Sequence, residues 1–474
     1  MTPTLLGLVV IGLGIAAAAR PAVLVALVLV GGIFDAAAAL VVGGGFGVPV
    51  AMVPALLLAG HVVAQYALGM RYPGEALVFR AMLPLLLLAA WAVLSAQVLP
   101  DLFGGRIMVW PNRPDPLAPV AVPLQRDSGN VTQTLYIVTN TIISLLAAVF
   151  LTRAAIPWGR LVEAYLLGGY AVVILCFWNL AARLGGVWFP AELLYSNPSW
   201  AIVEQWLGPV PRIQGPFSEP AALAVYLSGL CMACLSLAIA GWRRFRPMLL
   251  LLLAIACMLL STSTTGLAVL AAGLPLMLLA AAGTADARRL AAIARTMGVL
   301  VAAAGAAVAV LVLAVPGLPD MAGVVIEASL DKADSDSFAG RAEADRLAIE
   351  AMVATGGLGV GWGSTRSSSL IPGILGNGGV PGLLLVLLLC WNVLRLTLRA
   401  PGPAWHPARF AIMGFGAAIF GQLAAALVSA PGITNVLFFL QLAIVVGAAV
   451  RLRQDALESS RLAWGVPAAS VTLR

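Results

Sequence analysis

Apolar runs long enough to cross a bilayer recur along this chain from its first residues to about residue 450. An α-helix rises 1.5 Å per residue, so roughly 20 apolar residues span the ~30 Å hydrocarbon layer. With 61% hydrophobic and 10% charged residues, the 474-residue chain has too few polar side chains to cover a water-facing globule of its size. The sequence therefore predicts an all-α, polytopic membrane protein whose backbone polar groups are satisfied within helices.

The pattern predicts about thirteen spans in one integral membrane domain, residues 1–474, with no internal boundary. They lie at residues 4–22, 23–43, 47–69, 77–99, 131–151, 161–182, 220–241, 247–262, 265–283, 296–315, 373–394, 410–430 and 433–450. Three loops are large, at residues 100–130, 183–219 and 316–372. If these lie outside the cytoplasm, alternation places nearly all loop arginines and the C-terminus inside and the first residues outside, as the positive-inside rule favours.

The net charge of +7 comes from arginines that lie mostly in the short loops between the predicted spans. This distribution sets membrane topology and indicates no nucleic-acid partner. All five cysteines lie inside apolar runs. Cys231 and Cys234 have the spacing of a C-x-x-C motif, but helix packing explains them better, and no disulfide framework, metal site or cofactor is predicted. The run from Thr4 to Ala19 lacks a basic leader, which predicts a retained first helix instead of a cleaved signal peptide.

Ionisable side chains inside the predicted spans are few, and they include Asp35 and His61. Isolated carboxylates within a membrane are functional candidates by default. A proton-coupled transporter would need more ionisable side chains than these, placed deeper in the helix bundle. We therefore favour a structural role for Asp35 and His61, each paired with a neighbouring helix, over a role in transport.

The segment 316–372 interrupts the apolar chain with eight of its twenty acidic residues. A helix is predicted over residues 340–354, capped by Asp336 or Ser337, and its charged side chains fall at i, i+4 spacing as Arg341 with Asp345 and Arg346 with Glu350. These are either solvated pairs or arginines available to clamp a diphosphate through their bidentate forks.

Two shorter stretches are candidates for anion binding. Ser218 and Pro220 suit the N-cap and first turn of an apolar helix, which puts Arg212 and Glu219 beside a positive helix end. The glycine-rich run 356–363 follows no strand, so it is not a dinucleotide fingerprint. It predicts a tight turn whose exposed N–H groups, with Arg366 and the serines around it, form an oxyanion or sugar-phosphate site.

Aromatic residues crowd the loop 183–219, namely Trp188, Phe189, Tyr195, Trp200 and Trp206. An interfacial belt explains these rings better than stacking on sugars, although the two roles are compatible.

At these residues the chain resembles the O-antigen ligase and Wzy-type O-antigen polymerase family of bacterial inner-membrane proteins. The resemblance covers roughly residues 200–395. Its features are the R-x-x-G-x-F-x-E-P element from Arg212 to Pro220, the Ser-Thr-rich turn 261–266, and the large late loop. In that loop an arginine helix with Arg341 precedes a Gly-Val-Gly at 359–361 and the Asn-Gly-Gly-Val-Pro-Gly element at 377–382, which is expected to open the next helix.

The resemblance implies a metal-independent glycosyltransferase of the GT-C-like class that works on the periplasmic face of the inner membrane. Its donor would be an oligosaccharide on undecaprenyl diphosphate, made for O-antigen or exopolysaccharide, and its pathway partners a flippase and a chain-length regulator. Arg212 and Arg341 match the family's two functionally implicated periplasmic arginines. Arg366, in the stretch Gly-Ser-Thr-Arg-Ser-Ser-Ser, resembles a form of this loop found in exopolysaccharide polymerases. Glu219, beside Arg212, is our candidate for the catalytic base.

One departure separates the members of this family. Ligases typically carry a periplasmic histidine before the asparagine-glycine element, whereas the two histidines of this chain are His61, in a span, and His406, in a cytoplasmic loop. The sequence therefore favours a repeat-unit polymerase. The alternatives are a ligase that transfers finished glycan and, from another class, a flippase or transporter of the same lipid-linked substrate.

Overall fold

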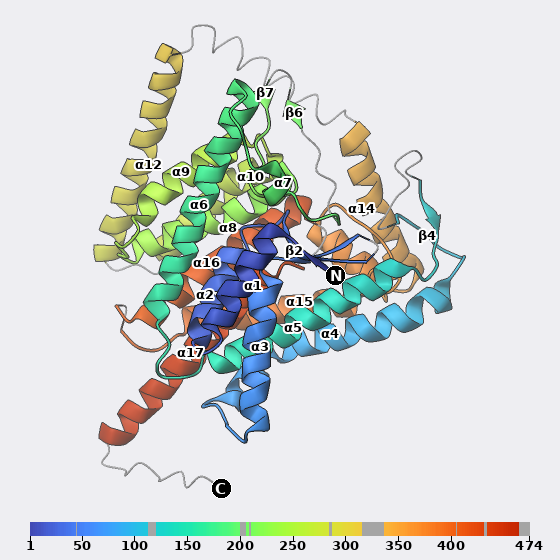
Figure 1. Ribbon diagram of the computed structural model, residues 1–474, viewed down its shortest axis with the longest axis horizontal. Helices are drawn as coiled ribbons and strands as arrows, with labels where there is room; N and C mark the ends of the chain where they lie inside the picture. The colour runs from blue at the N-terminus through green and yellow to red at the C-terminus, as the bar shows by residue number, and fades with distance from the viewer. Residues whose placement is uncertain are drawn as a thin grey trace.

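The computed structural model describes residues 1–43, 45–111, 120–199, 205–207, 210–283, 287–314, 336–403, 405–430 and 434–463. These ranges are mostly helical (Figure 1), and eight helical stretches are long and apolar enough to cross a membrane. The eight are Glu75–Phe103 (α4), Ser128–Phe150 (α5), Trp158–Gly185 (α6), Pro220–Ile239 (α8), Thr264–Gly283 (α10, η1 and α11), Leu370–Leu398 (α15), Pro407–Ser429 (α16) and the first part of Val436–Ala463 (α17). The prediction of a helical, membrane-embedded protein is confirmed.

The five other expected spans correspond to shorter apolar helices in the described residues. They are Leu5–Ala17 (α1), Pro21–Gly31 (α2), Met52–Ala67 (α3), Pro247–Leu260 (α9) and the stretch Leu290–Ala302 within Ala287–Ala314 (α12). A helix of 11 residues such as α2 rises only about 16 Å, half the hydrocarbon thickness. The expectation of thirteen spans is therefore not confirmed as a count.

The expected span over residues 23–43 is wrong. Helix α2 ends at Gly31, and the chain returns as a three-stranded antiparallel sheet of order β1-β2-β3, made of Thr2–Pro3, Ala38–Val42 and Phe46–Pro49. The adjacent Gly31 and Gly32, which have low helix propensity, lie at the end of the helix, and the β-branched Val41 and Val42 favour a strand. Asp35 consequently lies in the turn between α2 and β2, outside any helix.

Two short hairpins and two non-spanning helices complete the described part. The hairpins are Met108–Val109 (β4) with Val122–Pro123 (β5), and Trp206–Leu207 (β6) with Val210–Pro211 (β7). The helices are Ala191–Leu194 (α7) and Asp336–Ala354 (α14). Helix α14 packs against both β4 and α15, so the loop 100–130 and the late loop meet at one end of the bundle, at the right of Figure 1.

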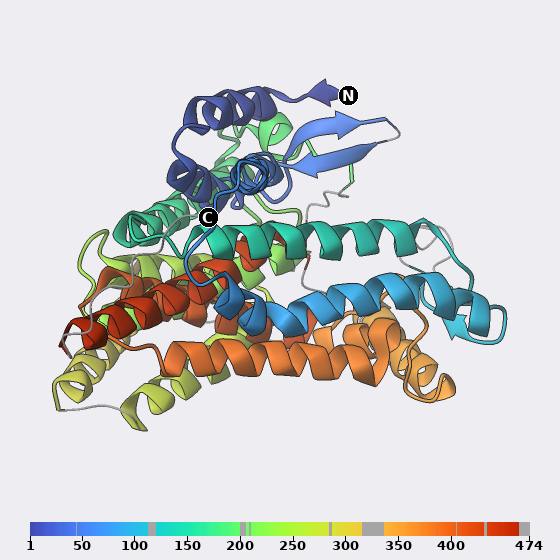
Figure 2. The ribbon, with the colours of Figure 1, turned by 90° about the horizontal axis from the view of Figure 1, so that it is seen from below.

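Helices α8 and α17 form the centre of the bundle, because 83% and 89% of their most apolar windows are buried. Helix α8 packs along α16, where small residues allow close approach. A Cβ on Gly421 would lie 2.4 Å from the carbonyl oxygen of Ser228. Outside this pair, α5, α4 and α15 lie side by side with α4 in the middle (Figure 2).

Helix α15 is broken at Gly379, whose φ of 64° and ψ of −165° are not helical. The helix begins at Leu370, so the Asn377-Gly-Gly element interrupts it instead of opening it. The break receives the glycine-rich run: a Cβ on Gly379 would lie 2.3 Å from the carbonyl oxygen of Gly357. Only glycine fits this contact, because it tolerates positive φ and has no Cβ.

We predict that Gly379→Ala lowers the stability of the folded protein by at least about 3 kcal/mol, from left-handed strain plus a backbone collision. Gly340→Ala is the matched control, because Gly340 lies in α14 with nothing within 4 Å of an added Cβ. That change should stabilise by about 0.5–1 kcal/mol. Thermal unfolding in detergent measures both, and similar transition temperatures for the two variants would contradict the tight docking.

Candidate functional site

A cavity of about 1600 Å³ lies between α8, α15, α16 and the glycine-rich run. Polar residues line it where α8 and α15 begin and where α16 passes into α17, and these include Asp35, Glu219, Arg366, Asn377 and Asn435. Its remaining length follows α15 and α16 and is mainly apolar, with Val386, Leu389, Val393, Ile419 and Phe420 among the lining residues. The cavity thus joins a polar region to a long apolar groove.

Of the four site residues predicted from the sequence, two line the cavity, and Arg212 and Arg341 are not among its lining residues. Glu219 and Arg366 are exposed and line the cavity. Arg212 is half-buried outside it and interacts electrostatically with both Arg341 and Glu219. The structure therefore brings together residues separated by more than 100 positions in the sequence.

Arg212 is held by the Ser-Thr-rich turn that the sequence singled out. Its Nε donates to the carbonyl oxygen of Ser261 at 3.2 Å and to Oγ1 of Thr262 at 3.1 Å, and a terminal nitrogen donates to the side chain of Gln205. Burial lowers the pKa of Arg212, the charge of Arg341 lowers it further, and Glu219 acts in the opposite sense. Arginine stays protonated throughout, so the two cations repel each other and an anion placed near both would relieve that repulsion.

The start of α8 differs from the expectation in one residue. Pro220 does occupy the first turn, but the N-cap is Glu219, and Ser218 is not the cap. A proline at the first helical position makes its predecessor the N-cap. The Ser218 hydroxyl instead donates to Oδ2 of Asp35 at 3.3 Å, and the Glu219 side chain makes no capping hydrogen bond.

The expectation that the glycine-rich run offers exposed N–H groups is wrong. The N–H groups of Gly363 and Thr365 donate to Oδ1 of Asn377 at 3.0 and 3.2 Å, and that of Val360 donates to the carbonyl oxygen of Gly376 at 2.8 Å. The backbone of Arg366 likewise donates to the carbonyl oxygen of Trp110 at 2.8 Å. These donors are already bonded within the protein, so the glycine-rich run and the residues that follow it, together 356–366, form a scaffold that presents the Arg366 side chain.

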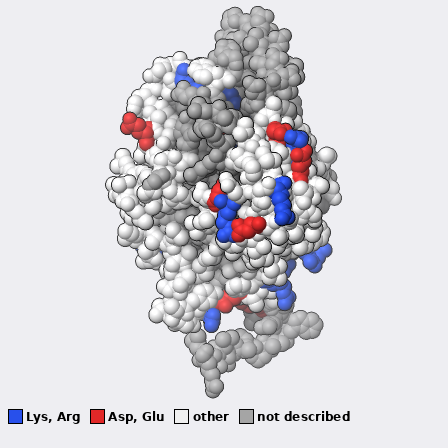
Figure 3. Space-filling view, turned by 90° about the vertical axis from the view of Figure 1, so that its right-hand side faces the viewer, with Lys and Arg blue, Asp and Glu red and all other residues white. Residues whose placement is uncertain are grey.

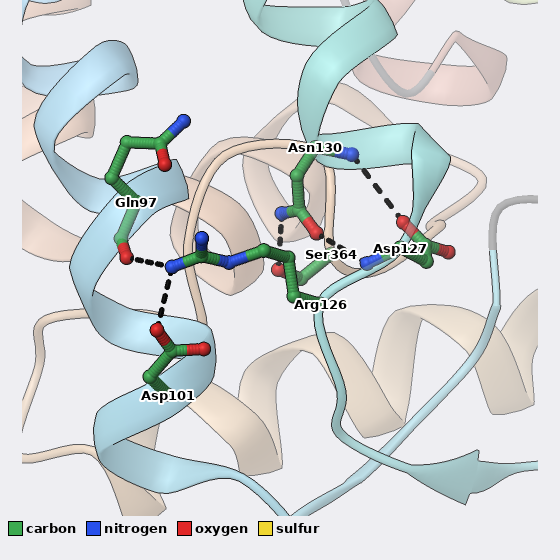
Figure 4. A network of polar contacts seen from close by, with 6 residues as sticks. All are labelled: Gln97, Asp101, Arg126, Asp127, Asn130 and Ser364. Atoms are coloured by element: carbon green, nitrogen blue, oxygen red, sulfur yellow. Dashed lines mark hydrogen bonds and ion pairs between the residues drawn. The ribbon is translucent and has the colours of Figure 1, made fainter.

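A polar network ties this scaffold to α4 and α5 (Figure 4). Asn130 Nδ2 donates to Oγ of Ser364 at 2.8 Å and to the carbonyl oxygen of Trp362 at 2.9 Å. Asp127 caps α5 and forms a capping box with Asn130. Arg126 pairs with Asp101 of α4 at 2.6 Å. The start of α5 is therefore fixed to the scaffold that carries Arg366.

Of the two ion pairs predicted on helix α14, one is present and the other is not. Arg346 pairs with Glu350 as expected, and also with Glu343 at 2.6 Å. Asp345 does not pair with Arg341. Its carboxylate accepts from Oγ of Ser369 at 2.6 Å and from the N–H groups of Ser368 and Ser369 at the start of α15, where a helix N-terminus favours negative charge.

Arg341 is consequently exposed, and in the part of the chain that the structure describes it has no carboxylate partner. Figure 3 shows the face of the molecule that carries α14 and the β4–β5 hairpin. Basic and acidic side chains lie together near the middle of this face, and further charged side chains are scattered toward its edges. Four of the eight acidic residues of the segment 316–372, together with Lys332, lie outside the described residues.

The aromatic residues of the loop 183–219 pack on one another. Trp178 of α6 contacts Trp188 and Phe189 edge to face, with ring centroids 5.6 and 5.9 Å apart, and Phe189 packs on Tyr195. These rings and Trp206 are not among the residues that line the cavity, while Trp200 lies outside the described residues. Their packing favours the interfacial role over sugar stacking in this cavity.

The histidines also lie away from the cavity. His406 caps α16 by accepting from the N–H of Ala408 at 3.2 Å, and the His61 ring sits edge-on to Phe150. Among the described residues, no three His, Cys, Asp or Glu side chains are grouped to hold a metal ion. Asp35 is the cavity residue that sequence reasoning undervalued; its one signal was a lone carboxylate in an apolar run.

No protein-family model matches this chain, and no curated protein is detectably similar to it. Function is therefore inferred from the chemistry of the cavity and from the motifs that place Arg212, Arg341 and Arg366 around it.

We predict that Asp345→Ala destabilises the start of α15 by about 1–2 kcal/mol, because three donors there lose their acceptor. The check is thermal unfolding in detergent, read out with a thiol-reactive dye on the buried cysteines of α6, α8 and α9. Glu350→Ala, which removes an exposed partner of Arg346 on the same helix, is the control and should leave the transition unchanged. Equal effects of the two changes would contradict the capping role.

Proposed function

We propose that this chain is a polysaccharide polymerase of the bacterial inner membrane. It would join oligosaccharide repeat units carried on undecaprenyl diphosphate, on the periplasmic face, as a metal-independent glycosyltransferase of the GT-C-like class. The observation that carries this proposal is the cavity of about 1600 Å³, in which a polar region lined by Asp35, Glu219 and Arg366 continues into an apolar groove between helices. Arg212, just outside the cavity, interacts electrostatically with Glu219 and with Arg341.

A lipid-linked sugar has a polar part and a long apolar part, as this cavity does. The prenyl chain is apolar and suits the groove along α15 and α16, lined by residues such as Leu389 and Phe420. The diphosphate carries negative charge and suits the region near Arg212, Arg341 and Arg366, since guanidinium groups bind phosphate oxygens in bidentate fashion. The sugars would occupy the polar region beside Glu219 and Asn377.

The reaction follows from this placement. A hydroxyl at the non-reducing end of an incoming repeat unit attacks C1 of the reducing sugar of the growing chain, and the bond from C1 to the diphosphate oxygen breaks. The arginines stabilise the negative charge that develops on the departing undecaprenyl diphosphate. Arg212 is already fixed by Ser261 and Thr262, whereas Arg341 is free to bind the leaving group.

The resemblance supplies the remaining parts of the proposal. The product would be O-antigen or exopolysaccharide, and the chain would act with a flippase and a chain-length regulator of the same pathway. Glu219 is the carboxylate that the motif places at the site, and it lines the cavity.

Two alternatives remain. A ligase would transfer finished glycan to another acceptor, and the placement of both histidines outside the cavity speaks against it, because ligases of the family use one near the asparagine-glycine element. A flippase for the same lipid would also bind diphosphate and prenyl chain. Such a transporter is expected to keep its activity after loss of the segment 316–372, whereas a polymerase is not.

We predict that Arg341→Ala abolishes polymer formation while the protein stays folded in the membrane. The gene is deleted in its native host and complemented with wild type, Arg341→Ala or Arg346→Ala, and the lengths of surface and carrier-linked glycan are compared on gels. Arg346→Ala is the matched control, one and a half turns along the same helix and already paired with Glu343 and Glu350, and should restore long chains.

Each outcome of this experiment assigns a function. Single repeats on the carrier with long chains lost on deletion support the polymerase, and normal polymer from Arg341→Ala would make that arginine structural. Long chains that remain on the carrier but miss their final acceptor indicate a ligase. Loss of all periplasmic intermediates indicates a flippase, and unchanged glycan would remove the proposal.

A further inference from the structure

Asp35 is a second carboxylate at the polar region of the cavity. It lies in the turn between α2 and β2, and it lines the cavity together with Ser218 and Glu219 at the start of α8. None of the sequence motifs includes it. The two segments are 183 residues apart in the sequence and meet only in the fold.

Backbone hydrogen bonds hold this turn against the start of α8. The N–H of Ala36 donates to the carbonyl oxygen of Pro216 at 3.2 Å, and the carbonyl oxygen of Ala36 accepts from the N–H of Asn197 at 3.1 Å. The Ser218 hydroxyl then contacts Oδ2 of Asp35. The backbone beside Asp35 is therefore held on both sides, and the Ser218 hydroxyl orients its carboxylate before any substrate arrives, which is what a proton acceptor in a pre-organised site requires.

The environment of this carboxylate suits proton transfer at neutral pH. Burial raises the pKa of Asp35 to about 6, the charge of Glu219 adds to this rise, and hydrogen bonds from Ser218 oppose it. Such a group is ionised near pH 7 but accepts a proton more readily than an ordinary aspartate. Glu219, by contrast, is exposed within electrostatic reach of Arg212, so its charge belongs to the cluster that surrounds the diphosphate.

We propose, on the basis of the polymerase function above, that Asp35 is the general base of the reaction. Its carboxylate takes the proton of the acceptor hydroxyl as the new bond from oxygen to C1 forms and the bond from C1 to the diphosphate oxygen breaks. The electron pair of that broken bond leaves with undecaprenyl diphosphate, and Asp35 then releases its proton to water. Glu219 is left to position Arg212 and the leaving group.

The test uses purified full-length protein in liposomes. The substrate is the carrier-linked single repeat extracted from the native host after deletion of this gene. Initial rates of polymer formation are measured from pH 5 to pH 8 for wild type, Asp35→Asn and Glu219→Gln. Among the described residues, the other ionisable groups that line the cavity are Tyr226, Arg366, Cys390 and Arg409, so Glu219 is the one other carboxylate whose titration has to be separated from that of Asp35.

We predict that Asp35→Asn lowers kcat by about 10² to 10⁴-fold with little change in KM, as expected for loss of a general base. The amide retains an oxygen acceptor for Ser218, so the variant should fold. The wild-type rate should rise about tenfold per pH unit below about 6 and level off above it, because the base acts only when deprotonated. Glu219→Gln should keep this pH profile and mainly raise KM.

The pH dependence of the wild-type rate tests the role of Asp35 without any substitution. A wild-type rate that is flat from pH 5 to pH 8, or an Asp35→Asn protein with wild-type kcat and pH dependence, overturns the role of Asp35 while the polymerase proposal stands. A profile that disappears in Glu219→Gln and persists in Asp35→Asn would assign the base to Glu219. Absence of polymer from wild type would remove the proposed function and this inference with it.

Discussion

The docking of the glycine-rich run into the break of α15 is the constraint on which the rest of the site depends. One side chain, Asn377, closes this contact: its Oδ1 accepts from two N–H groups of the run, and its Nδ2 donates to the carbonyl oxygens of Thr365 at 2.8 Å and Gly373 at 2.9 Å. A buried backbone segment must have its polar groups paired, and Asn377 supplies partners on both sides of this contact. The break in α15 is thus what allows an irregular loop to lie beside the cavity.

This scaffold explains why the charges around the cavity are available to a substrate. Asp345 is bonded to the start of α15 and Arg346 to its neighbours on α14, so these groups are already satisfied. Arg341 and Arg366 are exposed instead, and Arg212 is held close enough to Arg341 to be repelled by it. Among the described residues, no carboxylate forms a close ion pair with these three arginines, although Glu219 lies within electrostatic reach of Arg212. Cations that repel one another in this way are arranged to receive an anion, whereas paired ones mainly hold the protein together.

Sequence patterns predicted the features that local chemistry determines. The start of α8 at Pro220 follows from a proline that fixes φ, and the membrane-embedded helices follow from apolar length. Residues 23–43 were misread because apolar length does not distinguish a helix from a short helix followed by a strand. The N–H groups of the glycine-rich run were judged exposed because their acceptor, Asn377, belongs to a helix whose break no pattern revealed. Contacts between distant segments, such as Ser218 with Asp35, were outside the reach of any local rule.

The two carboxylates of the cavity differ in the way that acid–base chemistry requires. Glu219 is in the motif, beside an arginine, and exposed; Asp35 is in no motif, half-buried, and bonded to a hydroxyl. A carboxylate beside a guanidinium serves to position charge, whereas one partly removed from water holds a proton more readily. The motif therefore identifies the cluster that would bind the diphosphate. The proton acceptor that we propose comes instead from the turn between α2 and β2, which hydrogen bonds to Pro216 and Ser218 hold against the start of α8.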